Sequence, residues 1–384
     1  MTSGTAMLIP TYKTPELTFV AGRGSSLFTA DGTEYLDLVA GIAVAGVGHS
    51  HPTVVEAIAT RASKLIHASN LYGTEPQHAL AARLAAISGG KLSFFANSGA
   101  ESIECALKLA RKWSRREHGD RRTRIVAAQG GFHGRTFGAL AATGQPTKQK
   151  AFVPMLPGFT HVPYGDVAAL ADAVSDDVAA VLLEPIQGEA GVIVPPDGYL
   201  RSARELCDKA GALLILDEVQ TGLGRTGYWL AAEHEEVVAD IVCLAKALGG
   251  GLPIGACLAT PEIAAAFQPG DHATTFGGGP VQCAAALATL EVIESAGLLT
   301  RAIHAGSRLT AELGVRAKVR GRGLMLGLDL GAPIAAKVVQ AAAERRVLVN
   351  EVTSSVVRVT PPLVITDEEI DRAVGVLGEV LDAL

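Results

Sequence analysis

Short, unbroken apolar runs alternate with amphipathic stretches through the middle of the 384-residue chain, and this alternation most constrains its fold. The stretch from Ile103 to Ala110, for example, has apolar residues at i, i+3, i+4 and i+7, which predicts a helix with one apolar face. Apolar runs without polar alternation are typical of strands covered on both faces. The pattern predicts an α/β fold with a mostly parallel central sheet covered by helices. The expected strands are Leu92–Ala96, Ile125–Ala128, Ala180–Leu183, Leu213–Leu216 and Ile241–Leu244.

The two ends of the chain differ from its middle. Residues 17–38 predict a short strand pair around the turn Ala30-Asp31-Gly32-Thr33. The elements expected near the C-terminus are a long helix over Val281–Ser295, strands near Gly327–Leu330 and Val356–Val359, and a final helix. We therefore predict a large domain over residues 46–280 and a smaller α+β domain formed by residues 1–45 and 281–384.

Charge and cysteine content exclude several classes of function. The 33 Lys and Arg residues against 39 Asp and Glu give a net charge of −6, so we expect no nucleic-acid partner. Five dispersed cysteines without a CxxC pair predict free thiols in a reducing compartment, the cytoplasm. The chain has no signal-peptide pattern and no apolar stretch of about 18 residues, which predicts no membrane span. His49 and His51 lack a third ligand at suitable spacing, so we expect no metal.

The first of three segments with candidate chemistry follows the predicted strand that ends at Ala96. Ser98, Gly99 and Ala100 come next, at the start of a helix. Small residues leave the backbone N–H groups of a helix start accessible, and the helix dipole favours an anion such as phosphate. An ordinary N-cap by Ser98 explains the same segment, so this feature alone leaves both interpretations open.

Two further segments place an acid and a lysine after predicted strands. Four apolar residues run into Asp217, and a carboxylate at such a position needs a cationic partner or a metal unless it only caps a turn. Lys246 has apolar neighbours and is followed by glycines at 249–251. Burial lowers the pKa of a lysine, and a neutral amine can form a Schiff base, whereas a lysine that reaches the surface cannot be activated in this way.

The three segments are more specific together than apart. A phosphate site, an Asp at a strand end and a buried lysine are what a pyridoxal-phosphate enzyme requires. Lys246 would then carry the cofactor, and Asp217 would keep the pyridine nitrogen protonated so that the ring withdraws electrons. The sequence therefore predicts pyridoxal 5'-phosphate as cofactor.

Longer motifs connect these segments to a known family. They lie between about residue 35 and residue 363 and include GIAVAGVGHSHP, NSGAE, GGFHGRTFGAL, LEPIQGEAGV, LDEVQTGLGRTG, LAKALGGGLPIGA, HATTFGGGP and VRVTPPL. On these motifs the chain resembles the class III aminotransferases of pyridoxal-phosphate fold type I, and among them the acetylornithine aminotransferases. The resemblance implies a fold type I large domain, a smaller domain built from both termini, and a homodimer with shared active sites.

The resemblance also implies which residues contact the cofactor. Phe132 would stack on the pyridine ring and Gln220 would bind its hydroxyl, while Asp217 and Val219 would lie beside the ring. Thr275 would reach the phosphate of the neighbouring subunit. The full set of implied cofactor contacts is Ser98, Gly99, Ala100, Phe132, Asp217, Val219, Gln220, Lys246 and Thr275.

Four residues match substrate-binding positions of the family. Arg135 would bind the carboxylate far from the cofactor, and Arg358 the α-carboxylate of glutamate. Glu189 would pair with Arg358 whenever the substrate presents only a distal amine, because an unpaired arginine in a dry pocket is costly. Thr274 lies where substrate contacts the same loop as Thr275. Lys246, Asp217 and Glu189 are thus the expected catalytic residues.

These assignments predict a transaminase that moves the distal amino group of N2-acetylornithine to 2-oxoglutarate in arginine biosynthesis. Succinylornithine, succinyldiaminopimelate, free ornithine and 4-aminobutyrate are alternative donors, because their reacting ends are alike. Ile42 stands where ornithine aminotransferases tend to carry a tyrosine, which favours an acylated donor. A decarboxylase, an aminomutase, or a non-catalytic protein that keeps only the fold is a less favoured alternative.

Overall fold

A seven-stranded sheet forms the centre of the computed structural model, which describes residues 8–384. β10 runs antiparallel to both of its neighbours, and the other pairings are parallel, so the predicted mostly parallel sheet is confirmed. In spatial order the strands are β4 (Leu92–Ala96), β10 (Gly255–Ala259), β9 (Ile241–Leu244), β8 (Leu213–Asp217), β7 (Val178–Leu183), β5 (Arg124–Ala128) and β6 (Phe159–Val162).

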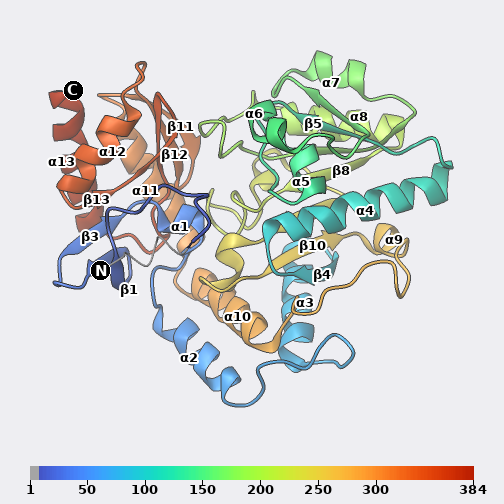
Figure 1. The fold of residues 1–384 in the computed structure, drawn as a ribbon, viewed down its shortest axis with the longest axis horizontal. Helices are drawn as coiled ribbons and strands as arrows, with labels where there is room; N and C mark the ends of the chain where they lie inside the picture. Colours follow the sequence, from blue (N-terminus) through green and yellow to red (C-terminus); the bar gives the residue numbers. More distant parts are fainter. Residues whose placement is uncertain (1–7) are drawn as a thin grey trace.

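Helices cover this sheet because its central strands are apolar on both faces. Every residue of β7, β8 and β9 is buried. The long helix α4 (Gly99–His118) packs across β4, β10, β9, β8 and β7, while α7 (Val167–Ala173) and α8 (Tyr199–Ala210) pack beside β6, β7 and β8 (Figure 1). The apolar stripe of α4 that starts at Ile103 is buried as predicted.

All five predicted strands are present, and two strands of the sheet were not predicted. β6 has the sequence FTHV, in which polar side chains interrupt the apolar run. β10 begins with Gly255, a residue that weakens strand propensity. Close packing requires this glycine, since a Cβ at position 255 would lie 2.3 Å from the backbone oxygen of Ser98.

Strands from both ends of the chain form two smaller sheets. In the first, residues 17–38 form three strands instead of the expected strand pair, and β3 also pairs with a strand from near the C-terminus. The two chain ends accordingly lie in the same lobe (Figure 1). One sheet contains β1 (Phe19–Arg23), β2 (Ser26–Thr29), β3 (Glu34–Asp37) and β13 (Val347–Leu348), and the other contains β11 (Lys318–Arg322), β12 (Met325–Asp329), β15 (Val356–Val359) and β14 (Asn350–Thr353).

The packing of α10 bears on where the proposed large and small domains divide. α10 (Pro280–Ser295) packs against α2 (Pro52–Ala62) and α3 (Glu75–Ile87), which flank the large sheet. We therefore propose to divide the large and small domains between α10 and α11 rather than at residue 280. The other helices are α1 (Ala40–Ala43), α5 (Phe137–Ala142), α6 (Pro146–Gln149), η2 (Lys150–Phe152), η3 (Ala231–Glu235), η4 (Lys246–Gly249), α9 (Pro261–Ala264), α11 (Leu298–Leu313), α12 (Ala335–Glu344) and α13 (Asp367–Ala383).

The helices within residues 8–384 can be compared with what a membrane span requires in length and composition. No single helix there has the length and apolar character needed to cross a bilayer. α10 and α11 are long and apolar enough only when they are taken together, and the two helices are bent by 65° relative to each other.

Candidate active site

A cavity of about 500 Å³ lies at the carboxyl ends of the parallel strands. Ligands bind at this edge in open α/β sheets because the loops that follow the strands converge there. The predicted site residues line this cavity, except for Arg358, Thr274 and Thr275. Arg358 reaches it through contacts with two lining residues, and the threonines line an adjoining cleft of about 1100 Å³.

One end of the cavity is formed by the start of α4. Ser98 is the N-cap, and its Oγ accepts a hydrogen bond from the Glu101 N–H at 3.2 Å. The first N–H groups of a helix have no partner within the helix, so Gly99 and Ala100 offer donors to an anion. A Cβ on Gly99 would lie 2.8 Å from Val219, which shows how closely the loop after β8 packs on this end. The N-cap interpretation of Ser98 is confirmed, and the anion site at Gly99 and Ala100 stays a prediction.

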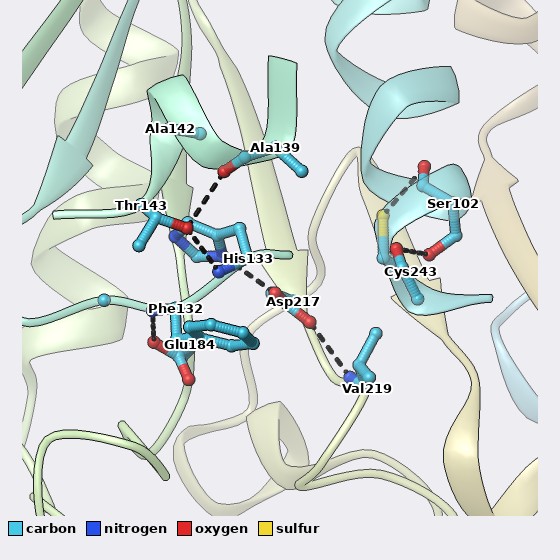
Figure 2. Close-up of polar contacts among 12 residues, drawn as sticks. Ser102, Phe132, His133, Ala139, Ala142, Thr143, Glu184, Asp217, Val219 and Cys243 are labelled. Carbon is cyan, nitrogen blue, oxygen red and sulfur yellow. Dashed lines mark hydrogen bonds and ion pairs between the residues drawn. The ribbon is translucent and has the colours of Figure 1, made fainter. Parts of the chain in front are cut away.

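Asp217 ends β8 and joins a buried polar network. Its Oδ2 lies 2.7 Å from Nδ1 of His133, and its Oδ1 accepts the Val219 N–H at 3.1 Å (Figure 2). Burial alone would lower the pKa of His133, but the hydrogen bond and charge of Asp217 outweigh burial and raise that pKa above its ordinary value. His133 is the partner that an acid at this depth needs, and its raised pKa favours the cationic form. Each Asp217 oxygen keeps a lone pair that can accept a hydrogen bond from a protonated ring nitrogen.

Glu184 directly follows β7 and lies close enough to His133 for its charge to act on that residue. One of its oxygens accepts the Phe132 N–H at 3.0 Å, and the other accepts the Gly188 N–H at 3.4 Å. Burial raises the pKa of Glu184 to about 7. Figure 2 shows Glu184 beside Phe132, with His133 and Asp217 behind them. Through these bonds the carboxylate positions Phe132 at the wall of the cavity.

Lys246 follows β9 and is the amine of the site. Its backbone has φ of +43°, a conformation that a residue with a Cβ rarely adopts and that the surrounding structure must stabilise. Burial lowers the pKa of Lys246 to about 8 against an ordinary 10.5. About a tenth of this amine is then neutral and nucleophilic at pH 7, far more than for an ordinary lysine.

Glu189 and Arg358 form an ion pair at a third side of the cavity. Arg358 Nη1 donates to Glu189 Oε1 at 2.6 Å and to Gln220 Oε1 at 3.0 Å, and Arg358 is only 1% exposed. Burial alone would raise the pKa of Glu189, but the charge and hydrogen bond of Arg358 outweigh burial and lower that pKa. Arg358 lies on β15, so this pair brings the small domain to the cavity.

Phe132 and Arg135 lie at another wall, in the loop between β5 and α5. The Arg135 guanidinium carbon lies 5.6 Å from the centre of the Phe132 ring. Arg135 is exposed to solvent, as expected of a group that meets an incoming substrate. Glu104 of α4 fixes this loop by accepting the Thr136 hydroxyl at 2.6 Å and the Gly138 N–H at 2.9 Å.

Thr274 and Thr275 lie outside the cavity, although Thr274 is connected to its edge. Asn97, which lines the cavity, donates its side-chain amide to Thr274 Oγ1 at 3.3 Å. Thr275 and Phe276 are exposed. Neither threonine therefore lines the cavity of its own chain.

His133 and Glu184 are functional residues that sequence reasoning missed. Both stand inside family motifs, FHGRT and LEPIQGEAGV, but nothing local indicates that His133 pairs with a residue 84 positions away. Within residues 8–384, no group of three or more His, Cys, Asp or Glu side chains is placed to hold a metal ion.

The cavity fits pyridoxal phosphate in three respects. It offers helix N–H donors at one end, Asp217 for a protonated ring nitrogen and Lys246 for an aldehyde. The family description "Aminotransferase class-III" matches residues 10–381, and the chain belongs to this family. It is a pyridoxal-phosphate-dependent transaminase.

Individual proteins of known name are similar to this chain over nearly its whole length. The chain is 50% identical to the acetylornithine aminotransferase of Methanopyrus kandleri, over 97% of this chain and 96% of that protein. Among solved structures, the N-acetylornithine aminotransferase of Stenotrophomonas maltophilia is 37% identical, with a TM-score of 0.82 and coverage of 96% of each chain. The ornithine aminotransferase of Toxoplasma gondii is 35% identical, with a TM-score of 0.94, over 99% of this chain and 93% of that one.

The lowered pKa of Lys246 can be tested in protein stripped of cofactor. We expect acylation of Lys246, followed by mass spectrometry at a series of pH values, to rise with a midpoint near 8. The reason is that only the neutral amine reacts, and burial favours that form. A midpoint equal to that of a reference lysine peptide would contradict the assignment.

Proposed function

We propose that this transaminase moves the distal amino group of N2-acetylornithine to 2-oxoglutarate, giving N-acetylglutamate 5-semialdehyde and glutamate in a ping-pong reaction. The observation that carries the proposal is the ion pair between Glu189 and the buried Arg358. A site for α-amino donors alone needs Arg358 free for their carboxylate. A site that first takes a distal amine needs Arg358 neutralised during that half-reaction, and Glu189 supplies this compensation.

The proton transfer is assigned to Lys246. When bound, the cofactor withdraws electrons from the substrate carbon that loses a proton. Once its amine is displaced by the substrate, Lys246 can carry that proton as base and then as acid, because its pKa of about 8 lies close to neutral pH. Asp217, supported by His133, holds the proton of the ring nitrogen. Ser98, Gly99 and Ala100 bind the phosphate, and Phe132, Val219 and Gln220 hold the ring.

The two substrates use the same arginines differently. With acetylornithine, Arg135 binds the carboxylate and Glu189 stays on Arg358. With 2-oxoglutarate, Glu189 moves away, Arg358 takes the α-carboxylate and Arg135 takes the distal one. Thr274 contacts substrate at the edge of the site. Loss and return of the Glu189–Arg358 contact thus lets one cavity accept two chemically different partners.

Acetylornithine is preferred over the related donors for two reasons. Relatives with that name are about half identical to this chain over almost its whole length. Ile42 offers no hydroxyl for the charged head of free ornithine, and Val44 beside it lines the cavity. Succinylornithine, succinyldiaminopimelate, ornithine and 4-aminobutyrate remain alternative donors with the same reacting end.

We further propose a cytoplasmic homodimer that serves arginine biosynthesis. Thr275 would complete the phosphate site of the partner subunit. The apolar side chains around this loop support such an interface, since Leu71, Tyr72 and Phe276 are 84, 72 and 63% exposed. A reducing location is supported by the five dispersed cysteines, which include no CxxC pair.

Steady-state turnover tests the proposed reaction. We expect purified protein with pyridoxal phosphate to form glutamate from acetylornithine and 2-oxoglutarate, and Lys246→Ala to form none, because the attachment point and the acid–base group are lost together. Glutamate release measured by an enzyme-coupled assay gives both results. Retained turnover in Lys246→Ala would overturn the role of Lys246, and inactive wild-type protein would overturn the substrate.

The role of Glu189 separates the two half-reactions. Replacing it by alanine leaves Arg358 unpaired while acetylornithine is bound, and breaking a buried pair costs several kcal/mol. We expect kcat/KM for acetylornithine to fall at least about 10-fold in Glu189→Ala, and the glutamate half-reaction to be retained. Single-turnover kinetics with each donor measures this ratio. Equal losses with both donors would show that Glu189 has a purely structural role.

A further inference from the structure

A second cation lies beside Phe132, on a segment to which the proposed function assigns no role. Lys148 belongs to α6, and its Nζ lies 5.6 Å from the centre of the Phe132 ring. The Arg135 guanidinium carbon lies at the same distance from that ring. The Lys148 Nζ and the Arg135 guanidinium carbon are therefore no more than twice 5.6 Å apart. Both approach the aromatic residue that lines the cavity.

Hydrogen bonds on either side of Lys148 hold its backbone against this loop. Gln145 donates its side-chain amide to the Gly130 oxygen at 2.9 Å. Gln149 donates in the same way to the Thr143 oxygen at 2.8 Å and the Leu140 oxygen at 3.0 Å. The segment that carries Lys148 is thus attached to Gly130, in the loop that carries Phe132 and Arg135, and to the end of α5, which follows that loop. These bonds fix where the Lys148 side chain leaves the backbone, beside the wall of the cavity.

Neither cation has an anionic partner within the described part of the chain. Over residues 8–384, no carboxylate lies within 4.0 Å of Arg135 or Lys148. An aromatic face attracts each cation but does not neutralise its charge. Two like charges beside one ring repel each other, and a bound anion that contacts both would offset that repulsion. The arrangement therefore favours a bound carboxylate.

We propose that Lys148 is the second cation of the distal-carboxylate subsite and, with Arg135, binds the substrate carboxylate far from the reacting carbon. This inference rests on the proposed function, because both of its substrates carry such a carboxylate. The ligand class is an anionic chain with its carboxylate remote from the amine or oxo group. Lys148 then sets specificity, since it favours such chains over neutral ones of equal length.

The test compares substrates that differ only in that carboxylate. N-acetylputrescine is acetylornithine without its carboxylate, and 2-oxopentanoate has a methyl group in place of the distal carboxylate of 2-oxoglutarate. In Lys148→Gln holoenzyme we expect KM for acetylornithine and for 2-oxoglutarate to rise about 5- to 10-fold, with kcat within about 2-fold of wild type. We expect kcat/KM for the two compounds that lack the carboxylate to change less than about 2-fold. Lys148→Arg should restore KM, because it keeps the charge.

A matched control removes the same charge from the same segment. Lys150 is exposed, two residues from Lys148, and the structure gives it no aromatic contact. Lys150→Gln should leave KM for both substrates unchanged, which separates direct binding from the general charge of the surface. Unchanged KM in Lys148→Gln, or equal losses with and without the carboxylate, would overturn the proposal. Failure of the proposed function is distinct, because wild-type protein would then not turn over acetylornithine at all.

Discussion

The buried guanidinium of Arg358 is the constraint on which the site depends. A fixed positive charge that is 1% exposed requires a permanent or exchangeable anion, and Glu189 supplies it at 2.6 Å. Arg358 comes from β15 of the small domain, and Glu189 from the loop after β7 of the large sheet. The ion pair therefore joins the two parts of the molecule at the substrate cavity. We propose that a substrate carboxylate replaces Glu189 in the second half-reaction, which would keep the charge of Arg358 compensated in both.

The chemistry at the centre of the cavity follows from the sheet. β8 and β9 are parallel neighbours, so Asp217 at the end of one and Lys246 after the other lie at the same edge. Burial acts differently on these two groups. It lowers the pKa of Lys246 to about 8, whereas Asp217 is compensated by His133 behind it. Lys246 therefore loses its proton more readily than an exposed lysine, and Asp217 is held at the edge of the cavity by its contact with His133.

Most of the large sheet could be predicted because its strands are continuous apolar runs. β6 and β10 could not, since polar side chains or a glycine interrupt them. Asp217 and Lys246 could be assigned from their positions after strands. The pairing of His133 with Asp217 could not, because it joins residues 84 positions apart. The positive φ of Lys246 also has no local sequence signal. The Glu189–Arg358 contact could be predicted only from the resemblance to a family. Its physical reason is the cost of leaving a buried arginine without an anionic partner.

The central claim is that one cavity accepts a distal amine and an α-oxo acid in turn. The visible absorption of protein loaded with pyridoxal phosphate tests it most directly, before and after N-acetylornithine is added without oxo acid. We expect the absorption band of the enzyme-bound cofactor to disappear with acetylornithine and to return when 2-oxoglutarate is added. A band that responds to glutamate but not to acetylornithine would contradict it.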